Sequence, residues 1–249
     1  MMMRNIWIKM LIAMLMATSV YGAEREKTTS VWREDFDISD DCAVQNIWPA
    51  GWALKATKLG VPKTTFYLMK DTADGDGWLV VQSEKSTGGL LCNPSVKVDL
   101  KKTPILRWRW SVQQLPEGGD GRKAGKDDQA IGIYIGANDW LMKKTIAYRW
   151  ETDTPVGTNG ESSYAGIVKV KWQCIRDKNS GIDVWYVEER NIAEDFKKAF
   201  GFIPAQFALT VSGNSQYTKS RTLAKIDYIE FVAAKRGNEE RKLAQRMEK

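Results

Sequence analysis

Short runs in which apolar and polar residues alternate recur along most of the chain, and Gly, Asn, Asp and Pro separate most of them. A period of two places successive side chains on opposite faces of a strand, and such runs between turn residues predict a half-buried sheet. Almost nothing between the runs has helical periodicity, which disfavours a parallel α/β fold. We therefore expect an all-β protein, an antiparallel jelly-roll-type β-sandwich. The expected strands are Val31–Asp37, Thr65–Lys70, Trp78–Ser83, Ser95–Leu100, Pro104–Val112, Gln129–Gly136, Thr145–Glu151, Tyr164–Cys174, Ile182–Glu189, Gln206–Ser212 and Leu223–Val232.

The segment Asn191–Phe200 has a helical pattern instead. Ile192, Phe196 and Phe200 recur every fourth residue, which places them on one side, and Gly201 follows the last of them. Asn is a preferred N-cap, and Gly commonly ends a helix. The sequence predicts one short, Asn-capped amphipathic helix between two strands.

The first 23 residues have the order of a secretory signal peptide. Arg4 and Lys9 precede the uncharged run Met10–Val20, and small residues then lead to Ala23. A membrane span would need ~20 apolar residues. We expect a signal peptide over residues 1–23, no transmembrane segment, and a periplasmic or secreted protein. The rest is expected to form a single β-sandwich domain over residues 24–234 and a charged, helical tail over residues 235–249.

Half of the net positive charge of the chain lies in that tail. The sequence has 37 Lys and Arg against 31 Asp and Glu, a net charge of +6. Arg4 and Lys9 leave with the signal peptide, and residues 235–249 carry six bases and three acids. The body is therefore nearly neutral, and nucleic acid is not expected as a partner of an exported protein of this kind.

Histidine is absent from the whole sequence, which narrows the chemistry. Its absence excludes His general bases, Ser-His-Asp and Cys-His nucleophiles, and His-based metal sites. Paired carboxylates, or a Tyr or Lys base, remain as catalytic options. Ten of the eleven Trp follow residue 23, and they suit either core packing or, where their faces are exposed, stacking on sugar rings.

Three cysteines, Cys42, Cys92 and Cys174, follow residue 23. In an oxidising compartment this odd number suggests one disulfide and one further thiol, with the pairing left open. Cys174 follows Val168, Val170 and Trp172 at a period of two, so we expect it to be the buried free thiol.

Several expected strands carry cationic or polar side chains on the face opposite their apolar residues. The ordinary explanation is the solvent-exposed face of an antiparallel sheet. The functional hypothesis is a cationic, partly aromatic concave face that binds an acidic or hydroxyl-rich polymer, because the Arg fork suits carboxylates. The candidate ligand-binding residues are Arg107, Arg109, Tyr134, Arg149, Lys169, Lys171 and Gln173.

Acidic residues gather in two loop segments. Glu117–Asp128 is expected to be an exposed, mobile loop, and Asp127 and Asp128 at its end suit structural pairing better than Ca²⁺ binding. Asp71–Gly77 resembles a calcium loop in composition, but a hairpin turn explains it more simply. We expect no metal site and no cofactor.

The chain also resembles a bacterial exported family known as domain of unknown function 3047, from roughly Asp35 to Val232. The resemblance rests on Leu106–Trp110, Asp127–Asp128, Ala147–Trp150, Glu189–Gly201, Ser212–Ser220 and Ala224–Phe231. It implies no activity.

This chain departs from the pattern of that family at three positions. The pattern favours acidic residues in the polar loop, where this chain has Ser212 and Asn214, and it often has Arg where this chain has Gly132. A ligand or metal site of the family at these positions would be altered here.

The favoured function is a non-catalytic exported binding module for a glycan or another component of the cell envelope. The alternatives are a polysaccharide lyase-like enzyme, with Tyr or Lys as base, and a structural envelope protein with a protein partner. The sequence names no catalytic residue and leaves the oligomeric state open.

Overall fold

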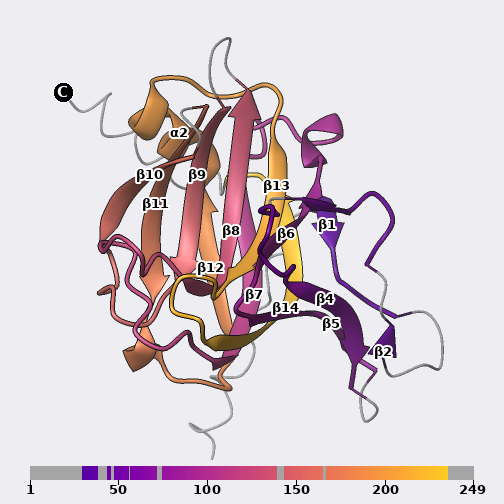
Figure 1. Cartoon of the computed structure of the whole chain (residues 1–249). Helices are drawn as coiled ribbons and strands as arrows, with labels where there is room; N and C mark the ends of the chain where they lie inside the picture. Colours follow the sequence, from indigo (N-terminus) through magenta and orange to yellow (C-terminus); the bar gives the residue numbers. More distant parts are fainter. Residues whose placement is uncertain are drawn as a thin grey trace, which may run out of the picture.

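The protein is a sandwich of two seven-stranded β-sheets, which we call sheet A and sheet B (Figure 1). The computed structural model describes residues 30–38, 44–45, 48–55, 57–71, 75–138, 143–164 and 167–234. Sheet A has the order β12-β7-β14-β5-β4-β2, with β1 also paired to β14, and sheet B has the order β10-β11-β9-β8-β13-β6-β3. The all-β jelly-roll expectation is confirmed.

The strands have the following bounds. Sheet A contains β1 (Ser30–Glu34), β2 (Val44–Gln45), β4 (Thr65–Lys70), β5 (Gly77–Glu84), β7 (Ile105–Gln114), β12 (Tyr186–Asn191) and β14 (Arg221–Val232). Sheet B contains β3 (Ala53–Lys55), β6 (Thr87–Cys92), β8 (Gln129–Asn138), β9 (Lys143–Trp150), β10 (Asn159–Tyr164), β11 (Val168–Arg176) and β13 (Ala208–Asn214).

The core between the sheets is rich in tryptophan. Trp108, Trp110 and Trp150 have no exposed surface. The rings of Trp108 and Trp110 meet edge to face at 5.3 Å between centroids, and Trp108 stacks on Tyr148 at 5.5 Å. The first pair lies within β7 of sheet A, and the second joins β7 to β9 of sheet B, so alternating aromatic positions connect the two layers.

Every expected strand except one overlaps an observed strand. Over Ser95–Leu100 the prediction is wrong: the chain forms a short 3₁₀ turn, η1 (Pro94–Val96), because Pro94 cannot donate to a sheet ladder and favours a helical start. The strands β2, β3, β6 and β10 were not expected. In β6 the run Gly88–Cys92 shows no alternation of polar and apolar residues, because two adjacent glycines are followed by Leu90, Leu91 and Cys92.

One strand pair of sheet B is parallel, which the sequence does not predict. The strands β9 and β11 run in the same direction, with Trp172 beside Ala147. The chain between them passes through β10, which takes the edge of the sheet and pairs antiparallel with β11. The remaining ladders are antiparallel, including the β4–β5 hairpin that the Asp71–Gly77 turn predicts.

The expected helix is confirmed as α2 (Ile192–Phe200). The Asn191 side chain accepts a hydrogen bond from the Glu194 N–H at 3.1 Å, and Gly201 ends the helix at φ 83°. The helix contacts β9 of sheet B and both β7 and β12 of sheet A, so it spans one end of the sandwich. Neither α2 nor any other helix in the described ranges has the length and apolarity to span a bilayer.

Cys92 and Cys174 are both free and buried, and Cys42 lies outside the described residues. Cys174 is therefore the buried thiol that the alternation predicts, but no disulfide involves either of these two cysteines. Burial, with Glu151 nearby, raises the pKa of the Cys174 thiol to about 12, and burial raises that of Cys92 further.

We expect neither Cys92 nor Cys174 to react with iodoacetamide at pH 8 in the folded protein, because only an accessible thiolate is a good nucleophile. Both should react fully in denaturant. Peptide mass spectrometry after alkylation measures each site separately, and labelling of either one in the native protein would contradict its burial.

Candidate functional site

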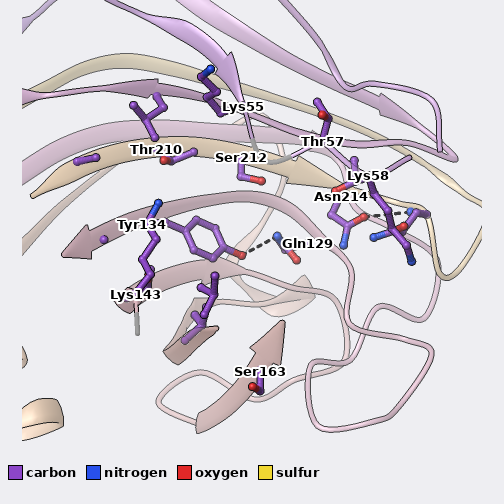
Figure 2. Close-up of a pocket in the computed structure, with 18 of the residues that line it drawn as sticks. Lys55, Thr57, Lys58, Gln129, Tyr134, Lys143, Ser163, Thr210, Ser212 and Asn214 are labelled. Atoms are coloured by element: carbon purple, nitrogen blue, oxygen red, sulfur yellow. Dashed lines mark hydrogen bonds between the residues drawn. The ribbon is translucent and has the colours of Figure 1, made fainter. Parts of the chain in front are cut away.

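Small side chains form a hollow on the outer face of sheet B. Across the ladders, Gly89 pairs with Ser212 and Ser212 pairs with Gly132. A Cβ at Gly132 would lie 2.8 Å from the Tyr134 ring, so glycine there lets the ring lie along the sheet. Together with the neighbouring rim, these positions leave a groove of about 680 Å³, which we call the sheet B groove (Figure 2).

The described lining of the groove combines polar and cationic groups with a larger apolar surface. The ammonium groups are those of Lys55, Lys58 and Lys143; the amides are Gln129, Asn214 and Gln216; the hydroxyls include Tyr134, Thr145, Ser163, Thr210, Ser212 and Tyr217. Burial, with Asp127 and Asp128 nearby, raises the pKa of the Tyr217 hydroxyl, so it stays protonated at neutral pH. Such a lining can donate to and accept from a hydroxyl-rich ligand.

Gln129 and Tyr134 meet on the floor of the groove. The Gln129 Nε2 donates to the Tyr134 hydroxyl at 2.8 Å, as Figure 2 shows. Gln129 is only 4% exposed, and its Oε1 is buried with no hydrogen-bond partner among the described residues. A buried acceptor without a partner is costly, and a donor from a ligand would satisfy it.

Beside the groove, Arg149 is enclosed in a buried charge cluster. Its Nη1 lies 2.6 Å from Asp127 Oδ1 and 3.4 Å from Glu151 Oε1, and both Arg149 and Glu151 have no exposed surface. The guanidinium also lies 5.0 Å from the Trp172 ring centroid. Its charge is therefore balanced inside the protein.

The loop Glu117–Asp128 is exposed at residues 117 and 122–126, as expected, but it is anchored by buried residues, which the sequence did not predict. Asp120 is completely buried, and its hydrogen bond with the Arg122 guanidinium holds the pKa of its carboxyl well below the usual range. Asp128 accepts from the Tyr217 and Thr218 N–H groups at 3.3 and 2.7 Å, which fixes the groove rim. Over the described ranges no cluster of His, Cys, Asp and Glu could hold a metal ion.

The structure separates the candidate arginines onto two sheets. Arg107 and Arg109 lie on the outer face of sheet A, opposite Trp108 and Trp110 as expected. Arg107 pairs with Glu189 at 2.9 Å and Glu230 at 3.1 Å, and Arg109 pairs with Asp227 at 2.7 Å. The hypothesis of one cationic face that includes Arg107, Arg109 and Arg149 is therefore wrong, because strand pairing placed β7 and β9 in different layers.

On β11 the alternation is correct but the faces are reversed. Val168 and Val170 line the groove, whereas Lys171 donates to the Ala199 carbonyl of α2 at 2.8 Å. Lys169 pairs with Glu161 at 2.9 Å. Lys171 and Gln173 line a second hollow of about 380 Å³ beside α2. The apolar residues turn outward here because Tyr134 and Ala147 offer them a second cluster on the groove side.

Of the seven candidate residues, only Tyr134 lines the sheet B groove. Sequence reasoning missed Gln129, Lys55, Lys58 and Lys143. One feature of the sequence could have indicated the groove. The positions that depart from the family pattern lie at or beside it on β8 and β13, and they are Gly132, Ser212 and Asn214. Ser212 pairs with Gly132, and Asn214 pairs with Gln129.

A family model described as "Protein of unknown function (DUF3047)" matches residues 50–230. No curated protein matches significantly. Among solved structures, the chain is similar to a cellulase derived from Cel12A of Rhodothermus marinus, at TM-score 0.42 and 11% identity, covering 74% of this chain and 94% of that one.

Two further structures are similar at the same level. The CBM22-1 xylan-binding domain of Paenibacillus barcinonensis Xyn10C has TM-score 0.39 and 11% identity, with 84% and 97% coverage. The xyloglucanase domain of NopAA from Sinorhizobium fredii has TM-score 0.43 and 10% identity, with 79% and 100% coverage. At such low sequence identities, the ligand named for each of those proteins is not transferred to this chain.

Proposed function

We propose that this chain, which belongs to the DUF3047 family of proteins of unknown function, binds a glycan or a similar envelope polymer in the sheet B groove without transforming it. The proposal includes export to the periplasm or outside the cell, where such polymers occur. The unpartnered Oε1 of Gln129 on the groove floor carries it, because a sugar hydroxyl is a donor that fits this acceptor.

The extent of the groove favours an extended ligand. Its lining reaches from Lys55 on β3 to Val168 on β11. Five strand-to-strand steps separate these strands in sheet B, roughly 24 Å at the usual spacing. Hydroxyl and amide groups from several strands line this path, among them the residues labelled in Figure 2.

One observation favours β-elimination of a polyuronate as a second candidate function. Tyr134 and Gln129 are within hydrogen-bond distance, and Lys143 lines the same groove. A lyase needs a Tyr or Lys base and a group that neutralises the substrate carboxylate. Incubation with polygalacturonate separates the two: unsaturated products that absorb in the ultraviolet would establish the lyase, and binding without products would establish the module.

We expect Gln129→Leu to weaken binding about tenfold, because the ligand loses its acceptor in a buried site. Binding of the purified protein to immobilised polygalacturonate, xylan and dextran measures this loss. Gln113→Leu is the matched control: Gln113 is on β7 of sheet A, and its Oε1 is also buried and without a partner in the described part of the chain.

Unchanged binding by Gln129→Leu would show that Gln129 on the groove floor does not contact the ligand, and an equal loss in Gln113→Leu would show the same. If the folded protein binds none of a broad set of glycans but retains one envelope protein, a structural role with a protein partner replaces the proposed glycan binding.

A further inference from the structure

We infer that the ligand of the sheet B groove is an anionic glycan, one that carries carboxylate or sulfate groups along its length. This inference rests on the proposed function and specifies the chemical class of its ligand. It follows from how the cationic side chains of the protein are used.

Several cations of the sheet strands are neutralised by neighbouring carboxylates. Arg107, Arg109 and Arg149 each contact at least one carboxylate within 3.1 Å. Lys169 is paired with Glu161 at 2.9 Å on the edge of sheet B. The positive charges of these residues are compensated within the protein, so they leave little uncompensated charge for a ligand.

The lysines of the groove are different. Lys55, Lys58 and Lys143 form no ion pair with any carboxylate of the described residues, and the described lining contains no Asp or Glu. Lys58 lies 5.7 Å from the ring centroid of Tyr217, also in the lining. Among the described residues, no carboxylate forms an ion pair with any of these three ammonium groups, although Asp127 and Asp128 lie near Tyr217. An anionic ligand supplies the complementary charge.

The placement of the three lysines favours a ligand with repeated negative charges over a ligand with a single one. Lys55 is on β3 and Lys143 on β9, and four strand steps of sheet B separate them, roughly 19 Å. Figure 2 shows Lys55, Lys58 and Lys143 around the pair Tyr134–Gln129. An ammonium group on a flexible stem can meet anions at varied positions, which suits a polymer, while the amides and hydroxyls between them contact the sugar ring.

We expect the variant Lys55→Gln, Lys58→Gln, Lys143→Gln to bind polygalacturonate about tenfold or more weakly, since three charge-assisted contacts are lost. Its binding to fully methyl-esterified polygalacturonate, which is neutral, should stay within about twofold. The matched control is Lys97→Gln, Lys101→Gln, Lys102→Gln, which removes the same charge from exposed positions outside the groove lining. Thermal melts confirm that both variants are folded. If the triple variant unfolds, the single variant Lys143→Gln replaces it, and we expect a smaller loss of affinity for polygalacturonate.

Two arms distinguish the source of the anion. Preference for polygalacturonate over its methyl ester supports a carboxylate, and preference for dextran sulfate over dextran supports a sulfate. Raising the salt concentration should weaken either contact. Equal binding of acidic and neutral glycans, or an equal loss in the control variant, overturns the inference and leaves the proposed function standing. Absence of binding to all four probes overturns both.

Discussion

Arg149→Leu is expected to lower the free energy of unfolding by about 3–5 kcal/mol, because it leaves buried carboxylates without their cation. Arg149 and Glu151 have no exposed surface, and Asp127 is largely covered. The loss also removes the guanidinium that lies over the Trp172 ring. Urea unfolding followed by tryptophan fluorescence measures the change.

Arg221→Leu provides the control. Arg221 forms an ion pair of 2.7 Å with Glu84, but both side chains are more than half exposed. Such a pair contributes about 0–1 kcal/mol, so this variant should remain close to the wild type. If Arg149→Leu were destabilised no more than Arg221→Leu, the buried charge cluster would not be a stabilising part of the body.

The contrast between these two arginines shows what alternation along a strand can predict. A period of two assigns Arg149 to the face opposite Tyr148 and Trp150, and the structure agrees. It does not tell how deeply that face is covered. The covering residues Asp127 and Trp172 come from a loop and from β11, and only the tertiary structure brings them beside β9.

The same limit explains why the groove could not be predicted from the sequence. The strands β7, β8 and β9 were each predictable, because a run of alternating large apolar residues is a local property. Which sheet each strand joins is not local, so Arg107 and Tyr134 could not be assigned to different layers from their own segments. The parallel pairing of β9 with β11 depends likewise on the path through β10.

Glycines formed the groove, and sequence reasoning gave them too little weight. Gly132 lies in β8, a strand that alternation predicts, whereas Gly89 lies in β6, a strand that the missing alternation concealed. A hollow arises where small residues of neighbouring strands fall in register, as Gly89, Ser212 and Gly132 do. Register is set by the ladders of the folded sheet, so a single sequence does not reveal such a coincidence.

The functional proposal has its most demanding test in the floor of this groove. Thr210 lies on β13 directly between Leu91 and Tyr134, and all three line the groove. We expect Thr210→Trp to lower glycan affinity at least ~30-fold, because an indole in the hollow excludes a ligand at a cost of about 2 kcal/mol or more. Binding to polygalacturonate and xylan, measured by calorimetry, gives the ratio.

Val187→Trp is the matched control, since it adds the same ring to a strand of sheet A at a side chain that is 52% exposed. Tryptophan is well tolerated in strands, so both variants should fold. If Thr210→Trp bound as the wild type does, the ligand would lie elsewhere, and the second hollow beside α2, lined by Lys171 and Gln173, would be the next surface to block. Loss confined to Thr210→Trp would place the ligand on the outer face of sheet B, in the groove that Gln129 and the three groove lysines line.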